Sequence, residues 1–336
     1  MAYLPRFTIT PEILQLLEKI QVLHARITAS SVKVRWMPSL QQDVLIRTAH
    51  GSSAIEGNPL TVQEAKRVLE GDSPARASRR SIQEIKNNIA VLRFIQKHSR
   101  VATLSEKLVH KVHALLGQNE ALDRGPVGYY RSTGVRVGDH VAPAAADVPR
   151  LVRDLLEWIN HEGRRWPAVV SSAVFHFRFE WIHPFGDGNG RVGRGLALWE
   201  LYRRQFDAHH IFAVDEIIWE NRPAYYATLA RVQRDLAQDL TDWIRFMSRL
   251  TVQALERTWK RMASLQRSAR GIAITLTPNQ ERLLDLLRGK PMPIAEIQKA
   301  LKVTKPGAHH ILKPLLAAGL VRREGGHKTG VYRLSG

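Results

Sequence analysis

A run of twelve residues constrains the fold more than any other part of this 336-residue chain. It extends from His183 to Arg194 and has the sequence His-Pro-Phe-Gly-Asp-Gly-Asn-Gly-Arg-Val-Gly-Arg. The segment before it is apolar and rich in phenylalanine. Its helix should end before Pro184, because proline disfavours a helical residue ahead of it and cannot continue a helix. A second apolar segment resumes near Gly190. We therefore predict a helix, a tight loop and a second helix.

The composition of the loop is typical of an anion-binding site. Its glycines permit close approach of a ligand to the backbone, and the unpaired N–H groups of the following helix N-terminus face outward. An amide side chain and two guanidinium groups add donors. Phe185 is the apolar residue expected to fix the loop to the core. The predicted phosphate-binding residues are Gly186, Gly188, Asn189, Gly190, Arg191 and Arg194.

Two further side chains of the run indicate a reaction. Asp187 is a carboxylate among cations, which is typical of a ligand for a hard metal ion that also contacts phosphates. His183 lies at the rim of the loop, where a neutral imidazole could accept a proton from an attacking hydroxyl. The combination predicts phosphoryl or nucleotidyl transfer.

The run resembles the signature of the Fic family, His-Pro-Phe-x-Asp-Gly-Asn-Gly-Arg-x-x-Arg, at every fixed position. The resemblance implies transfer of AMP from Mg·ATP to a Ser, Thr or Tyr hydroxyl of a target protein, with Mg²⁺ as cofactor. It also implies self-modification as a side reaction. The implied roles are general base for His183, Mg²⁺ ligand for Asp187, donor to the α-phosphate for Asn189, support of the anion site for Arg191 and γ-phosphate binding for Arg194.

A second motif lies near the end of a helix expected over residues 39–54. Glu56 follows this helix, where the helix dipole disfavours a carboxylate that has no cationic partner. The stretch resembles the inhibitory motif of Fic proteins, Ser/Thr-x-x-x-Glu-Gly/Asn, with Ser52, Glu56 and Gly57 at the matching positions. The resemblance implies that Glu56 pairs with Arg194 and excludes the γ-phosphate, so that the resting enzyme is slow. It also raises removal of AMP as a second activity.

Residues 125–150 lose helical periodicity, and valines alternate with polar residues over 135–141, which predicts a short β-hairpin. In the Fic family a hairpin called the flap pairs with the target by strand addition, and residues 130–141 match its position. A structural loop over the core is the alternative. The expected docking residues are Arg131, Val135, Arg136 and Val137.

The C-terminal part has the pattern of a separate domain. Three short helices and two strands around a Gly-Gly turn resemble a winged helix-turn-helix. Such domains bind DNA or serve in protein docking and dimerisation, and both alternatives stay open, a homodimer included. The basic residues that could meet DNA phosphates are Lys302, Lys305, His309, His310, Lys313, Arg322, Arg323 and Lys328.

Taken together, the patterns predict a mainly α-helical protein in four segments. These are an N-terminal helical region with the inhibitory helix (1–75), a Fic core (76–250), a helix end and linker (251–274) and a winged helix-like domain (275–336). Tyr225 and Tyr226 could line the nucleotide pocket or pack in the core, whereas His176 is expected to be a core residue. A nucleotide-sensing, DNA-binding transcriptional regulator is the alternative function.

Composition adds a few limits. The formal net charge of +19 favours acidic partners such as nucleotides or nucleic acid. The chain has no cysteine, which excludes disulfides and thiolate metal sites. The N-terminus lacks a signal pattern, and no apolar run approaches the length of a membrane span, so we expect a cytoplasmic protein with no membrane partner.

Overall fold

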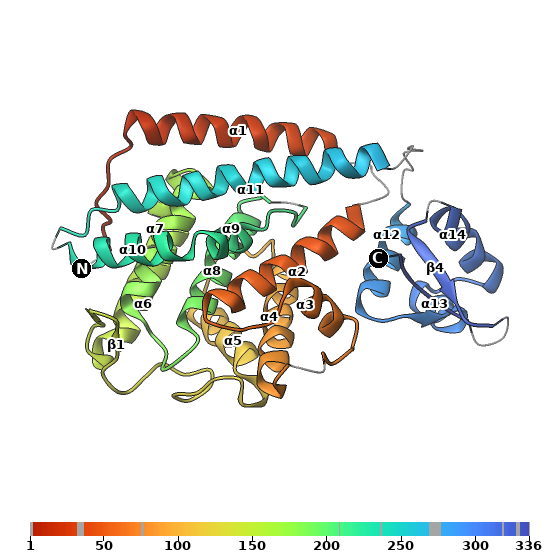
Figure 1. The fold of residues 1–336 in the computed structure, drawn as a ribbon, viewed down its shortest axis with the longest axis horizontal. Helices are drawn as coiled ribbons and strands as arrows, with labels where there is room; N and C mark the ends of the chain where they lie inside the picture. Colours follow the sequence, from red (N-terminus) through yellow and green to blue (C-terminus); the bar gives the residue numbers. More distant parts are fainter. Residues whose placement is uncertain are drawn as a thin grey trace. The chain divides into compact units, whose positions relative to one another are not determined.

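The computed structural model describes residues 3–31, 37–74, 77–207, 209–235, 237–268, 277–317, 319–326 and 330–335. Lys328, one of the basic residues expected on the wing, lies outside the described residues. The described chain is mainly helical, as predicted (Figure 1). None of its helices is long and apolar enough to cross a membrane.

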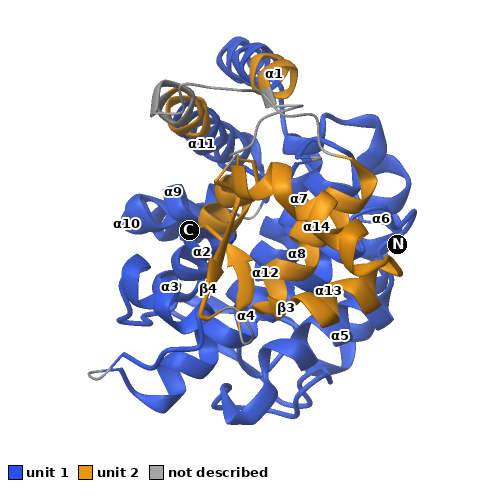
Figure 2. Cartoon of the chain, turned by 90° about the vertical axis from the view of Figure 1, so that its right-hand side faces the viewer, with its two compact units in different colours: residues 1–24, 45–257 blue, residues 25–44, 258–336 orange. Residues whose placement is uncertain are grey.

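The chain forms two compact units, coloured separately in Figure 2. The first unit comprises residues 1–24 and 45–257, and the second comprises residues 25–44 and 258–336. This division does not coincide with the four expected segments, whose boundaries remain a prediction. The helices of the first unit or shared with it are α1 (Pro11–Ser31), α2 (Met37–Ile55), α3 (Val62–Leu69), α4 (Arg79–Lys97), α5 (Glu106–Leu116), α6 (Val148–Asn160), α7 (Ala168–Ile182), α8 (Asn189–Arg203), α9 (Val214–Glu220), α10 (Arg222–Arg234) and α11 (Thr241–Ser268).

The core of the first unit is the pair α7 and α8, which pack against each other. Helix α7 is apolar on all sides, as a helix in the centre of a domain should be. Phe175, Phe177 and Phe179 are buried in it, and Trp199 is buried in α8. Helices α4 and α5 contact α8, and α6 contacts α7. The loop that carries the predicted site thus joins two helices, α7 and α8, which are surrounded by α4, α5 and α6.

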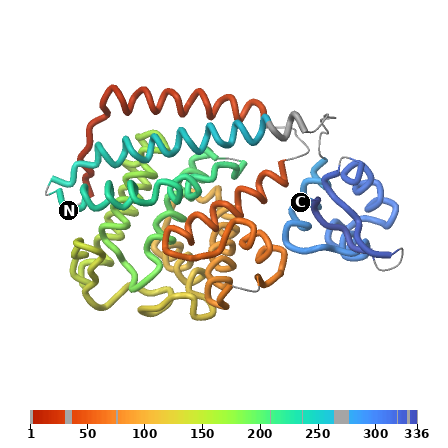
Figure 3. Tube along the Cα trace, in the orientation of Figure 1, coloured from red at the N-terminus to blue at the C-terminus, as the bar shows by residue number. Residues whose placement is uncertain are grey.

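Helices α1 and α11 run side by side, as the tube in Figure 3 shows. Ion pairs, two of which follow, join the parts of these helices that belong to the first unit. Lys19 Nζ lies 2.7 Å from Glu256 Oε1, and Glu12 pairs with Arg249. Both pairs are solvent-exposed and should contribute little to stability.

The hairpin predicted within residues 130–141 is present and very short. Strands β1 (Arg136–Val137) and β2 (His140–Val141) are antiparallel, with Arg136 opposite Val141 and Val137 opposite His140. Short 3-10 turns occur nearby at Gln118–Glu120, Ala145–Asp147 and Glu162–Arg165.

The C-terminal part of the second unit has its own apolar core. It contains α12 (Pro278–Gly289), β3 (Met292–Pro293), α13 (Ile294–Leu301), α14 (Lys305–Ala317), β4 (Val321–Glu324) and β5 (Val331–Leu334). The strands form an antiparallel sheet in the order β3-β5-β4, one strand more than expected. The buried side chains come from the helices and the sheet together, and they include Leu283, Leu287, Ile297, Leu312, Leu315 and Tyr332.

Candidate active site

The loop between α7 and α8 has the predicted boundaries. Helix α7 ends at Ile182, and His183 follows in the left-handed region with φ of 50°. Few residues other than glycine adopt that conformation, and they concentrate at functional sites. Gly188, with φ of 75°, precedes the first residue of α8. The helix, loop and helix predicted from the sequence are therefore confirmed.

Phe185 and Asn189 hold the loop in place. The ring of Phe185 is fully buried and stacks on His113, with centroids 3.8 Å apart. Asn189 Oδ1 accepts a hydrogen bond from Phe185 N at 2.8 Å, and its Nδ2 donates to Phe185 O at 2.9 Å. Both ends of this buried side chain are thus used within the loop. The Nδ2 group has a second N–H, and donation by Asn189 to the α-phosphate remains a prediction.

Replacement of Asn189 with alanine tests this structural role. It removes two buried hydrogen bonds and leaves both backbone groups of Phe185 without their partners. The free energy of unfolding is expected to fall by about 2 kcal/mol or more in urea titrations. An unchanged midpoint of unfolding would mean that the side chain does not hold the loop.

His113 is a site residue that the sequence did not reveal. Its Nδ1 accepts from Gly128 N at 2.9 Å, so Nε2 carries the proton and donates to Asp187 O at 3.1 Å. Burial lowers the pKa of His113 to about 4, which keeps the ring neutral. Nothing in a helix with an apolar face distinguishes this histidine from an ordinary core residue.

Asp187 is not among the residues that line the cavity described below. Its Oδ2 accepts from Asp123 N at 2.8 Å, and its Oδ1 accepts from Gly188 N. The side chain is partly exposed, and the described residues contain no cluster of three acidic or imidazole side chains that could bind a metal by themselves. A single oriented carboxylate nevertheless fits Mg²⁺, which usually takes one or two carboxylates and completes its shell with phosphates and water.

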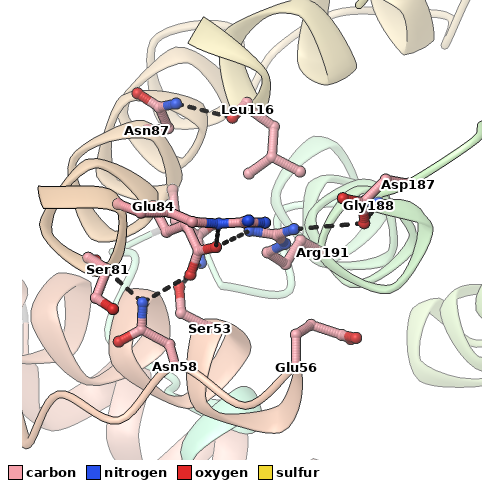
Figure 4. Close-up of polar contacts among 12 residues, drawn as sticks. Ser53, Glu56, Asn58, Ser81, Glu84, Asn87, Leu116, Asp187, Gly188 and Arg191 are labelled. Carbon is pink, nitrogen blue, oxygen red and sulfur yellow. Dashed lines mark hydrogen bonds and ion pairs between the residues drawn. The ribbon is translucent and has the colours of Figure 1, made fainter. Parts of the chain in front are cut away.

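Arg191 does not line the cavity described below, and its expected support of the anion site remains a prediction. Its buried guanidinium lies 3.8 Å from Asp187 Oδ1 and 3.9 Å from Glu84 Oε1, as Figure 4 shows. Glu84 in turn accepts a hydrogen bond from Asn58 Nδ2 at 2.8 Å. Arg191 therefore balances two carboxylates and orients Asp187.

Arg194 and Glu56 form the contact that the sequence predicted. Arg194 is only 2% exposed, and its Nη2 donates to Glu56 Oε1 at 2.8 Å and to Ser52 O at 2.9 Å, while Nε donates to Ser52 Oγ at 3.1 Å. Burial opposes the charge of Arg194, but nearby Glu56 raises the pKa of the guanidinium above its usual value. Gly57, with φ of 96°, ends the helical segment just beyond Glu56. The Nε and Nη2 groups of Arg194 are thus engaged by the end of α2.

Gly190 makes room for this pair. A β-carbon at Gly190 would overlap Glu56 Oε1 and lie 3.1 Å from Arg194 Nη1. Only glycine therefore lets the carboxylate approach the first turn of α8 so closely.

His183 is neutral at physiological pH. Burial lowers its pKa to about 4, and a hydrogen bond to the carbonyl oxygen of Glu180 opposes this in part. Because one ring nitrogen bonds to that carbonyl, the other is left as a proton acceptor. This is the protonation state that a general base requires.

A cavity of about 370 Å³ brings part of the predicted set together. His183, Gly190, Arg194 and Glu56 line it. The hairpin supplies another wall through Val137 and its neighbours up to His140. The lining residues include Tyr225 and Tyr226. They do not include five other residues of the predicted set, Gly186, Asp187, Gly188, Asn189 and Arg191.

Arg131 was expected to dock the target, but in the structure its side chain is buried and bonded within the protein. Its side chain is 4% exposed and donates to Thr133 O at 2.7 Å, to Pro143 O at 2.6 Å and to His183 O at 2.8 Å. A guanidinium used in this way cannot contact a target. Arg131 instead ties the base of the hairpin to the loop that carries His183.

Residues 103–201 match the model of the Fic/DOC family. The curated "Protein adenylyltransferase Fic" of Nematostella vectensis is 26% identical over 223 residues, which cover 61% of this chain and 46% of the relative. "Protein adenylyltransferase fic-1" of Caenorhabditis elegans is 26% identical over 213 residues, covering 61% and 39%. The chain thus spans less than half the length of these relatives.

Solved structures of Fic proteins are also similar to this chain. A Fic family protein from Desulfovibrio desulfuricans G20 superposes with a TM-score of 0.67 at 29% identity, covering 99% of both chains. Fic-1 from C. elegans, residues 134–508, superposes with a TM-score of 0.64 at 20% identity over 75% of this chain and 73% of that chain, a likeness of fold alone. Residues 103–201 therefore form a Fic domain, and the chain as a whole is similar to a Fic family protein.

Proposed function

We propose that the chain is a protein adenylyltransferase that moves AMP from ATP to a hydroxyl of a target protein. The observation that carries the proposal is that neutral His183, Gly190 on the first turn of α8 and buried Arg194 line the same cavity. An imidazole base, a helix N-terminus and a guanidinium are the groups that transfer of a nucleotidyl group requires. The curated relatives are named protein adenylyltransferases.

In the proposed reaction the hydroxyl oxygen of a Ser, Thr or Tyr residue attacks the α-phosphorus of ATP. The bond from the α-phosphorus to the bridging oxygen breaks, pyrophosphate leaves, and His183 takes the hydroxyl proton. Arg194 binds the γ-phosphate and sets the line of attack, which matters because such reactions depend on placement and charge neutralisation. Asp187 would hold Mg²⁺, which neutralises phosphate charge when it is bound.

The contact between Glu56 and Arg194 supports an autoinhibited ground state. Arg194 Nη2 already donates to two oxygen atoms, one of them the Glu56 carboxylate. A γ-phosphate must displace Glu56 to reach the guanidinium. In the same position Glu56 could orient a water molecule that removes AMP from a modified target. Removal of AMP is therefore a second proposed activity.

The hairpin is the proposed docking element for the target. Val137 is 44% exposed and Val141 is 62% exposed, which is unusual for valines in strands. Exposed apolar side chains beside the cavity favour addition of an extended target segment to the hairpin. Val135 and Arg136 flank this surface, whereas Arg131 is excluded from it for the reason given above.

Labelling with α-³²P-ATP and Mg²⁺ tests the proposed activity. The Glu56→Gly variant, incubated with a lysate of the source organism, is expected to transfer label to a small set of proteins and to itself. Mass spectrometry should find AMP on hydroxyl side chains. Label from γ-³²P-ATP in place of α-³²P-ATP would show phosphate transfer and reject adenylyl transfer.

A second candidate function rests on the C-terminal unit. Its three helices, with an antiparallel sheet that ends in a hairpin, fit the expected winged helix, and Lys302, Lys305 and Lys313 are exposed on or beside α14. A DNA-binding regulator with a nucleotide-sensing Fic domain would place these lysines against phosphates.

Electrophoretic mobility shifts of the full chain test this candidate. If the domain binds DNA, Lys305→Glu with Lys313→Glu should weaken binding about tenfold or more at 100 mM salt, because each lost phosphate contact reduces affinity and its salt dependence. The exposed pair Lys107 and Lys111 on α5, changed in the same way, serves as the control. Equal binding by both variants would leave docking to protein as the role of this domain.

A further inference from the structure

Glu180 is a buried carboxyl in the cavity wall that the proposed reaction does not use. It lies on the last turn of α7, is 6% exposed and lines the cavity together with Arg194. Within the described part of the chain its Oε1 has no hydrogen-bond partner, and that atom is out of reach of solvent. Buried polar atoms without partners are rare in proteins and usually point to a function or a missing ligand.

Glu180 and Glu56 each pack against a glycine of α8. A β-carbon at Gly193 would overlap Glu180 Oε1, just as one at Gly190 would overlap Glu56 Oε1. Residues three apart lie on the same side of a helix, so the two carboxyl groups rest on one face of α8, about one turn apart. Arg194 and Glu180 line the same cavity, and the charge of Arg194 acts on the Glu180 carboxyl. A phosphate that replaces Glu56 at Arg194 therefore arrives beside Glu180.

The surroundings of Glu180 keep its carboxyl protonated. The groups that face it are His176 on its own helix, Arg194 on α8, Tyr225 on α10 and Glu56 at the end of α2. Burial raises the pKa of Glu180 to about 8, with Glu56 adding to the shift and Arg194 opposing it.

None of these neighbours donates a hydrogen bond to Oε1 in the described structure. His176 Nδ1 lies 3.9 Å away, and burial lowers the pKa of His176 to about 3, so the ring is neutral. Its Nε2 is 2.9 Å from the Tyr225 hydroxyl. At Oε1 a carboxylate would thus lack both water and donors, whereas the neutral acid carries an O–H group that can itself donate.

We propose that Glu180 is a nucleotide-binding residue, whose protonated carboxyl donates a hydrogen bond to an anionic oxygen of the phosphate that replaces Glu56 at Arg194. This inference rests on the proposed function, because it takes ATP as the ligand. An ionised carboxylate would repel the phosphate, so the contribution exists only while the acid keeps its proton. The donor is present below the pKa of Glu180 and is lost as the pH rises through it.

Binding of Mg·ATP by isothermal titration calorimetry tests the inference. The Glu56→Gly variant, in which the competing carboxylate is absent, is the parent. Addition of Glu180→Leu should weaken binding about tenfold at pH 6.5, the size expected for one hydrogen bond to a charged group. Glu180→Gln keeps a donor and should bind within about twofold of the parent. Adenosine, which has no phosphate, should bind the Leu and Gln variants equally.

The pH dependence separates this role from a structural one. Between pH 6.5 and pH 9 the parent should lose affinity by about tenfold relative to the Glu180→Gln variant, because only the parent loses its donor. Glu157→Gln removes an exposed carboxylate on α6 that does not line the cavity and serves as the control, in which the dependence should persist.

The outcomes are distinguishable. If no variant binds Mg·ATP, the proposed function itself fails. If all variants bind with the same affinity and the same pH profile, nucleotide binding stands and the role of Glu180 is rejected. Equal weakening of ATP and adenosine by Glu180→Leu would show a packing role and would also reject the inference.

Discussion

Replacing His183 with alanine should lower AMP transfer by a factor of about 10² to 10⁴, the usual contribution of a positioned general base. The measurement is the initial rate of labelling by α-³²P-ATP in the Glu56→Gly background, where transfer is not limited by inhibition. The reason is that His183 is the neutral acceptor in the cavity wall, with its other nitrogen bonded to the carbonyl of Glu180.

The affinity for ATP should change little in the same variant, because the imidazole acts on the target hydroxyl and the phosphates are held elsewhere. His161→Ala, which removes an exposed histidine at the end of α6, is the matched control and should label targets at the parental rate. A His183→Ala protein that labels targets as fast as the parent would remove His183 from the role of base.

Replacing Glu56 with glycine should raise the rate of transfer by about a hundredfold, since a misplacement of about 1 Å at a reacting centre can cost that much. The change frees Arg194 Nη2 for the γ-phosphate. Glu56→Gln keeps the size of the side chain without the charge, and its rate should lie between those of the wild type and the glycine variant.

The Glu56→Gly substitution should also change the melting temperature of the protein. Removal of Glu56 leaves the buried guanidinium of Arg194 with Ser52 as its partner in α2. The melting temperature should therefore fall without nucleotide and recover with saturating Mg·ATP, whose phosphate takes the vacated place. An unchanged rate of transfer, with or without a change in melting temperature, would contradict autoinhibition by Glu56.

Much of the architecture could be predicted because strong local signals fix it. Pro184 and the glycines of the motif determine where α7 ends and where α8 begins. The hairpin followed from alternating valines. Strand β3 was missed because it has two residues and exists only through pairing of Met292 with Tyr332, forty residues later in the chain. Local sequence contains no trace of such pairing.

The directions of side chains within the motif were less predictable. Asn189 and Arg191 belong to the signature, and a signature does not say whether a side chain faces the ligand or the protein. Arg191 and Arg194 are three residues apart on α8, yet Arg191 meets carboxylates of α4 and the loop, and Arg194 meets the end of α2. These partners come from distant segments, so packing of the whole unit decides the two roles.

Glu180 illustrates the same limit. In sequence it is one acidic residue in an apolar helix, and only the fold brings its carboxyl against Gly193 and into one cavity with Arg194. The glycine at that position is not one of the fixed residues of the signature. The pattern of the motif therefore gave no reason to connect the two residues.

The central claim is that ATP and Glu56 compete for one guanidinium. A crystal structure of the Glu56→Gly variant with Mg²⁺ and a non-hydrolysable ATP analogue tests it most directly. We predict that the terminal phosphate lies within hydrogen-bonding distance of Arg194 Nη2 and that the α-phosphorus faces His183 across the cavity. A nucleotide bound outside this cavity, or one whose terminal phosphate makes no contact with Arg194, would contradict the account.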